Sequence, residues 1–256
     1  MDKPGPKPRP FECREDLFWY LVGLIATDGS LSIDGRHINI TGEKNHLLEI
    51  RDVLALPNRV TPKDKNPRGR TFQIQIGSRV LYDRLLAIGL TPRKTWSIKN
   101  LRVPDEFFGD FLRGAIDGDG SIRRWIHPTN GREQWMVFVC GVSRPFLEWI
   151  SDTVAKLWSV SGRIHTQQED RGFPLHKLKF GKLAARVIFT KCYRPEALAL
   201  ERKKLLAQQC VRSVVGWSKS KTVERREHWQ GWNYRRSNGS DLVLDRNNLI
   251  LESIVC

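Results

Sequence analysis

The apolar positions of this chain follow two different periods. Residues 21–26 (LVGLIA) are apolar nearly all round, which predicts a helix at the centre of the fold. In residues 72–77 (FQIQIG), apolar and polar side chains alternate, which predicts an antiparallel strand with one buried and one polar face. Further helices are predicted at 48–56, 79–89, 146–158 and 183–193.

These patterns occur twice along the chain. The segment LVGLIATDG (21–29) recurs 91 residues later as LRGAIDGDG (112–120), and HINITGEKNHLLE (37–49) pairs with residues 136–148 at an offset of 99. The larger offset places an insertion in the second copy, between residues 122 and 135, where Asn130-Gly131 indicates a turn. A repeat of roughly a hundred residues is too long for a solenoid and predicts two pseudo-symmetric halves.

Each copy has the predicted order helix, strand, strand, helix, strand, strand, helix. We therefore predict an α+β fold built by internal duplication of αββαββα halves, with two antiparallel sheets forming a saddle around two central packed helices. The predicted organisation is a flexible, basic, proline-rich arm at 1–11, a first half at 12–100, a second half at 101–210 and a basic, tryptophan-rich extension at 211–256. The extension suits either an arm along a DNA backbone or a packing segment.

Charge narrows the class of partner. The 256 residues carry a formal net charge of +15 and a pI of about 9.9, which favours a polyanion, above all nucleic acid, over an ordinary basic soluble protein. No apolar run has spanning length and no secretory signal is present, so we expect no membrane partner. The five cysteines are scattered and the six histidines show no metal-ligand spacing, which favours reduced thiols in a cytoplasmic protein.

Both copies of the apolar helix end in Asp-Gly, at Asp28 and Asp119. Small residues at helical spacing would let the two helix backbones approach closely and bring the aspartates side by side. The small residues of this predicted helix interface are Gly23, Ala26, Gly114 and Gly118. Two carboxylates at helix C-termini repel each other, and bound divalent cations such as Mg²⁺ would remove that repulsion. The alternative, that Asp-Gly merely ends a helix, explains one copy better than two.

LVGLIATDG and LRGAIDGDG resemble the two motifs of single-chain LAGLIDADG homing endonucleases, and the resemblance extends over roughly residues 12–210. It implies that Asp28 and Asp119 are catalytic and bind metal, with the backbone carbonyls of Thr27 and Gly118 as supporting ligands. The implied cofactor is Mg²⁺, as two or three divalent ions, for which Mn²⁺ or Ca²⁺ would substitute in binding. The earlier acidic position of the motif, Ala26 in the first copy and Asp117 in the second, is not usually catalytic in the family.

The resemblance also implies a basic residue near each metal. Lys94 in TPRKT and Lys203 in ERKKL match that position, where a cation would stabilise developing phosphate charge. A phosphate anchor or a solvated surface charge is the alternative for each lysine. Gly42 and Gly141 stand where the family commonly has a polar residue, often glutamine, so another group would have to position the water.

The polar strand faces are candidates for contacts in the DNA major groove, although such a face is also compatible with simple solvation. Candidates in the first half are Ser30, Ser32, Asn39, Thr41, Thr61, Lys63, Arg68, Arg70, Gln73 and Gln75. Candidates in the second half are Ser121, Arg123, Trp125, His165, Gln167, Lys177 and Lys179. Phe138 and Cys140 fall on the same face and fit a polar surface poorly.

The leading hypothesis is a monomeric, Mg²⁺-dependent site-specific DNA endonuclease that makes a staggered double-strand break. Its target would be a pseudo-palindromic but asymmetric double-stranded site of roughly 20 bp, because the two halves carry different side chains. The resemblance implies a homing endonuclease that is either free-standing or intron-encoded. If the intron belongs to an organelle, the expected location is the organellar matrix instead of the cytoplasm. The alternatives are an RNA maturase that assists intron splicing and a catalytically inactive DNA-binding regulator of the same fold.

Overall fold

The computed structural model describes residues 13–63, 71–168 and 172–214. The predicted arm at 1–11, the candidates Arg68 and Arg70, and the extension beyond residue 214 lie outside the described residues. Within the described part, no helix is both long and apolar enough to span a membrane.

The first half is a four-stranded antiparallel sheet with strand order β1-β2-β4-β3. Its register opposes Ile38 to Ile76 and Ile40 to Ile74, and these four isoleucines form the buried face. Alternation along each strand then directs the residues between them to the opposite, polar face. The elements of this half are α1 (Glu15–Asp28), β1 (Gly29–Leu31), β2 (His37–Gly42), α2 (Lys44–Val53), β3 (Val60–Pro62), β4 (Phe72–Gly77), α3 (Arg79–Ile88) and α4 (Lys94–Ser97).

The second half repeats this topology as a sheet of order β5-β6-β8-β7, again antiparallel throughout. The insertion lengthens the first hairpin: β5 has seven residues where β1 has three, and Gly131 in its turn has the positive φ of 62° that favours glycine. The elements are η1 (Asp105–Phe107), α5 (Phe108–Asp117), β5 (Gly120–Ile126), β6 (Glu133–Gly141), α6 (Arg144–Trp158), β7 (Arg163–Gln168), β8 (Pro174–Gly181), α7 (Lys182–Cys192) and α8 (Glu201–Arg212).

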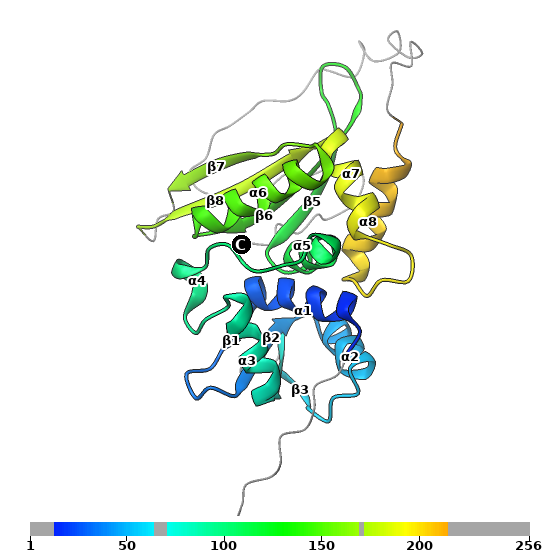
Figure 1. Cartoon of the computed structure of the whole chain (residues 1–256). Coiled ribbons are helices and arrows are strands. Elements are labelled where there is room, and N and C mark those ends of the chain that lie inside the picture. Colours follow the sequence, from blue (N-terminus) through cyan, green and yellow to red (C-terminus); the bar gives the residue numbers. More distant parts are fainter. Residues whose placement is uncertain (1–12, 64–70, 169–171, 215–256) are drawn as a thin grey trace, which may run out of the picture.

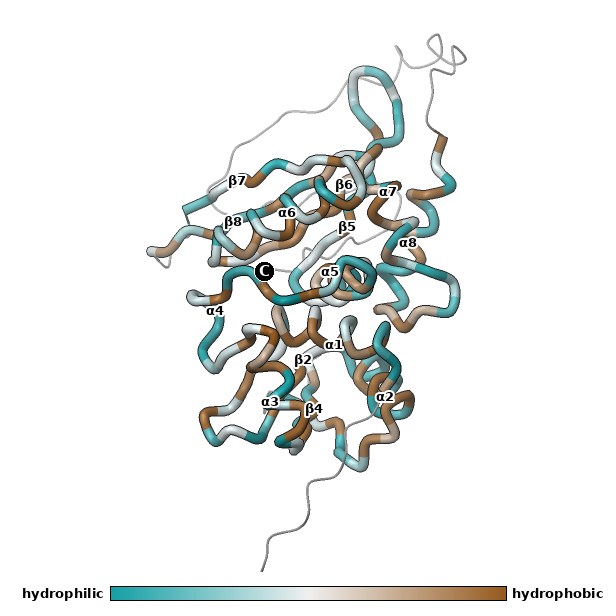
Figure 2. Tube along the Cα trace, in the orientation of Figure 1, coloured by the Kyte–Doolittle hydropathy of each residue, from teal (hydrophilic) through white to brown (hydrophobic). Residues whose placement is uncertain are grey.

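The predicted duplication of αββαββα units around two central helices is confirmed, and α4, η1 and α8 are additions to it. Figure 1 shows α1 and α5 at the middle of the molecule, with one sheet on either side. Figure 2 shows brown, apolar residues along much of α1 and mostly teal, polar residues along the outer strand β7. Residues 17–26 of α1 are all buried, which explains why this helix is apolar nearly all round.

Two glycines allow α1 and α5 to touch. A Cβ on Gly23 would lie 2.1 Å from the carbonyl oxygen of Phe111, and a Cβ on Gly114 would lie 2.1 Å from that of Tyr20. Neither position has room for a side chain, so the small residues of the motif determine how closely the helices pack.

Candidate active site and nucleic-acid interface

The C-terminal ends of α1 and α5 meet at the middle of the molecule, between the two halves (Figure 1). Asp28 is the last residue of α1, and Asp119 lies in the turn between α5 and β5. A Cβ on Gly118 would lie 2.0 Å from Thr27 Oγ1 and 3.4 Å from Asp28 Oδ2. The carboxylate of Asp28 therefore lies beside the residue that precedes Asp119, and the close approach of Thr27 leaves no room for a side chain at position 118.

Both candidate lysines are buried against backbone carbonyls of the two motifs. Lys94 and Lys203 are 6% and 2% exposed, so neither is a solvated surface charge. Lys94 Nζ donates to the carbonyl of Gly29 at 2.7 Å, and Lys203 Nζ donates to the equivalent carbonyl of Gly120, also at 2.7 Å. An ammonium at the carbonyl end of a helix interacts favourably with the helix dipole. Each lysine therefore fixes the end of a motif and places positive charge there.

Lys203 is held more extensively than Lys94. Its Nζ also donates to the carbonyls of Ile116 at 2.6 Å, Asp117 at 2.9 Å and Gly118 at 3.2 Å. The Gly118 carbonyl, expected as a metal ligand, thus already accepts a hydrogen bond, and this bond is the longest of the four.

The acids and lysines share one electrostatic environment. Burial raises the pKa of Asp28, and the charges of Lys203, Lys63 and Lys94 oppose that rise. Burial lowers the pKa of Lys94 to about 8, against the opposing charges of Asp119 and, more weakly, Asp28.

For Lys203, Asp28 has a stronger effect on the pKa than Asp119, which is the reverse of the order at Lys94. Burial lowers the pKa of Lys203 to about 8, and Asp117 opposes this most, followed by Asp28 and then Asp119. Each lysine thus interacts more strongly with the motif-terminal aspartate of the other half. The charged groups at the ends of the two motifs therefore lie close enough to influence one another across the two halves.

The oxygen donors at the helix ends suit a hard divalent cation. Asp28 and Asp119 supply carboxylates, and Thr27 and Gly118 supply backbone carbonyls. No group of three or more His, Cys, Asp and Glu side chains gathers in the described ranges. A pair of carboxylates with two backbone carbonyls fits Mg²⁺, which commonly binds one or two carboxylates and completes its shell with water and substrate phosphates. Bound cations would also stabilise the charged form of Asp28, which burial disfavours.

The polar face of the first sheet is lined by amides and hydroxyls. Asn39 is opposite Gln75, while Thr41 and Thr61 are both opposite Gln73. A hollow of about 300 Å³ lies on this face, lined by Asn39, Asn58, Arg59, Thr61, Gln73 and Gln75. The interpretation of the sequence missed Asn58 and Arg59, because they precede β3 and lie outside its alternation.

The polar face of the second sheet is more basic. His165 is opposite Lys177, and Arg163, which the sequence interpretation did not include, is opposite Lys179. Phe138 and Cys140 lie on the same rows, opposite Lys179 and Lys177. The guanidinium of Arg123 lies over the Phe138 ring, 5.2 Å from its centroid, so an apolar side chain supports a cation on this face.

All the predicted contact residues in the described part of the chain lie on or beside the strands of the two sheets. Ser30, Asn39 and Thr41 lie on β1 and β2, Thr61 on β3, Gln73 and Gln75 on β4, Ser121, Arg123 and Trp125 on β5, His165 and Gln167 on β7, and Lys177 and Lys179 on β8. Ser32 and Lys63 immediately follow β1 and β3. The positive charge of Lys63 also opposes the rise in the pKa of Asp28.

The comparisons with known proteins give the same fold. No protein-family model and no curated protein sequence matches the chain. The solved structure of the homing endonuclease I-WcaI bound to its DNA recognition sequence has a TM-score of 0.52 at 10% identity and covers 76% of this chain and 86% of that chain. The LAGLIDADG homing endonuclease I-GzeII in complex with its DNA target has a TM-score of 0.51 at 9% identity, covering 76% and 88%.

A third solved structure, the N-terminal LAGLIDADG domain of DUF199/WhiA, has a TM-score of 0.47 at 18% identity and covers 76% of this chain and 89% of that chain. This chain has the fold of the LAGLIDADG homing endonucleases.

Proposed function

We propose that this protein is a Mg²⁺-dependent, site-specific DNA endonuclease that makes a staggered double-strand break. The observation that carries this proposal is the meeting of Asp28 and the Asp119 turn at the touching ends of α1 and α5, between two buried lysines. Ending two packed helices does not require an aspartate at both ends, whereas metal-assisted phosphodiester hydrolysis uses carboxylates that converge from the two motifs.

The residues have distinct roles in this reaction. Divalent cations, when bound, would activate water and stabilise the leaving oxygen of the phosphodiester. Asp28 and Asp119 would hold them, one from each motif, with the carbonyls of Thr27 and Gly118. Lys94 and Lys203 donate to backbone carbonyls, so they would stabilise the growing phosphate charge through their field rather than as direct donors.

The two sheets would bind the duplex on either side of the scissile phosphates. Amides such as Gln73 and Gln75 pair well with adenine, and cations such as Lys177 and Lys179 pair well with guanine or phosphate. Because the two faces differ, the target would be asymmetric, with about one helical turn for each half and roughly 20 bp in total. One chain contains both motifs, so a monomer would suffice. A nuclease of this kind would promote the spread of the element that encodes it.

The test is a cleavage selection on a randomised DNA library with Mg²⁺. Asp28→Asn and Asp119→Asn should each abolish double-strand cutting while the affinity for the selected DNA is largely kept. Asp83→Asn is the matched control, because Asp83 is an exposed aspartate of α3 paired with Arg79, and it should cut normally. Cutting that survives both motif substitutions would refute the proposal, and so would an intact protein that assists RNA splicing or binds DNA but never cuts it.

A further inference from the structure

A third carboxylate lies at the end of α5 and has no role in the proposed chemistry. Asp117 is 5% exposed, and each of its oxygens is hydrogen-bonded. Oδ1 accepts from Tyr193 OH at 2.7 Å, and Oδ2 accepts from Tyr20 OH at 2.9 Å and from the Leu200 amide at 2.8 Å. The equivalent residue of the first motif is Ala26, so this arrangement belongs to one half only.

The bond from Leu200 determines where α8 begins. Leu200 is the N-cap residue of α8, and its carbonyl accepts from the Lys203 amide at 2.9 Å. One turn into the helix, the Lys203 side chain returns to the carbonyls of Asp117 and Gly118. Asp117 therefore ties the start of α8 to the end of α5, and Lys203 closes the same connection from the other side.

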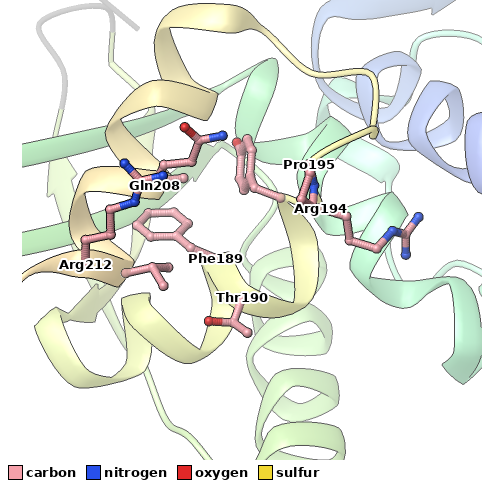
Figure 3. A pocket seen from close by; sticks show the side chains of 9 residues that line it. Phe189, Thr190, Arg194, Pro195, Gln208 and Arg212 are labelled. Atoms are coloured by element: carbon pink, nitrogen blue, oxygen red, sulfur yellow. The ribbon is translucent and has the colours of Figure 1, made fainter.

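The middle of α8 packs on the core through Ala207 and Cys210, which are fully buried. A hollow of about 260 Å³ separates parts of α7 and α8, and Figure 3 shows Phe189, Thr190, Gln208 and Arg212 around it. At the far end of α8, Arg186 donates to the carbonyl of Ser213. The helix is thus held by apolar packing in its middle and by polar attachments at its two ends, so losing the attachment at Asp117 would free the end that carries Lys203.

The lysine of the first half has a different support. Lys94 begins the four-residue helix α4, and its N-cap residue Arg93 has a φ of 56°, in the left-handed region. Its ammonium donates to the Gly29 carbonyl, and Ala26 offers no carboxylate to anchor a following helix. The two lysines of the proposed site are therefore held by unequal means.

We propose that Asp117 is a positioning residue that holds α8, and with it Lys203, in place, so that its loss slows the cutting of one DNA strand more than that of the other. This inference rests on the proposed nuclease function. It assigns a role to a residue that contacts neither metal nor DNA in that proposal, and it predicts different cutting rates for the two DNA strands when this residue is lost.

Lysine labelling tests the positioning without any need for cleavage. The full chain is treated with an acetylating reagent, and the modification of Lys203 and Lys94 is followed by peptide mass spectrometry. In Asp117→Ala, which copies the alanine of the first motif, labelling of Lys203 should rise by about 10-fold or more while that of Lys94 stays constant. Unchanged protection of Lys203 would overturn the inference.

Three variants separate positioning from a general loss of stability. Leu200→Pro removes the amide donor and replaces a buried leucine side chain by a smaller apolar ring. The φ of −66° at this residue already suits proline, so this variant should reproduce the effect if Asp117→Ala does not fold. Tyr193→Phe removes another hydrogen bond to the same carboxylate but keeps the attachment of α8, and should leave Lys203 protected. Asp117→Asn retains an acceptor for the Leu200 amide and should largely restore protection.

Strand-resolved cleavage tests the consequence for the reaction. On a selected target labelled differently on each strand, Asp117→Ala and Leu200→Pro should slow one strand by about 10-fold or more relative to the other, so that nicked duplex accumulates. Tyr193→Phe should keep the wild-type ratio. Equal slowing of both strands, in step with the loss of stability, would overturn the inference. A wild-type protein that cuts no DNA would instead refute the proposed function, and the labelling result would still decide the role of Asp117.

Discussion

Replacing Gly114 by alanine tests whether contact between the helix backbones determines the geometry of the site. A Cβ at this position would lie 2.1 Å from the carbonyl oxygen of Tyr20 and 2.9 Å from the amide nitrogen of Leu24. Both atoms belong to the backbone of α1, so no side chain can rotate away. Ordinary contact begins near 3.4 Å, so α1 and α5 would have to separate by about 1.3 Å.

This separation should affect both stability and cutting. Overpacking a core costs about 1–3 kcal/mol, and two opposed backbones favour the upper end. Alanine recovers about 1 kcal/mol of helix propensity over glycine, which leaves a net loss of about 2 kcal/mol in the free energy of unfolding. Because the same shift moves Asp119 relative to Asp28, cutting should fall by about 100-fold.

Urea unfolding and cleavage of a selected target measure the two effects. Gly181→Ala is the matched control, since a Cβ there meets nothing within 4 Å and the φ of −73° is ordinary. A Gly114→Ala protein as stable and as active as the Gly181→Ala protein would refute the reasoning.

Three further predictions concern charge. Burial lowers the pKa of Lys94 to about 8, so its ammonium group is charged below that pH and neutral above it. The ratio of the wild-type cutting rate to that of Lys94→Met should therefore fall as the pH rises through about 8. A ratio that stays constant would exclude a role for the charge. Asp110→Asn leaves the 1% exposed side chain of Arg113 without its carboxylate, and should lower the free energy of unfolding in urea by about 3 kcal/mol or more; a loss below about 1 kcal/mol would contradict this. Lys177→Gln should reduce the slope of log affinity for DNA against log salt concentration by about 1. Gln73→Ala should leave that slope unchanged and alter the preferred bases. Equal slopes for the two variants would count against a phosphate contact at Lys177.

The fold could be predicted because its signals are local and occur twice. Alternation in FQIQIG determines which strand face is buried, and the observed register places Ile74 and Ile76 in the core as that pattern requires. Gly23 and Gly114 are likewise a local signal that occurs twice. They indicate close helix packing, and in the structure a side chain at either position would meet the backbone of the other helix.

The supporting groups of the site could not be predicted, because they join residues far apart in the chain. Asp117 is bonded to Tyr20, Tyr193 and Leu200, which are 97, 76 and 83 positions away. No period or motif spacing encodes such pairs. The sequence identified Lys203 as a candidate but not its four carbonyl acceptors, since these depend on where α8 returns to the end of α5.

The unequal first hairpins have a consequence for how far the protein would reach along its target. At about 3.4 Å per residue, the seven residues of β5 extend about 24 Å, whereas the three residues of β1 extend about 10 Å. Trp125, near the far end of β5, is 39% exposed and so available to a ligand. On the proposed function, a protection footprint would therefore be lopsided about the break, with its longer arm on the side of the second sheet.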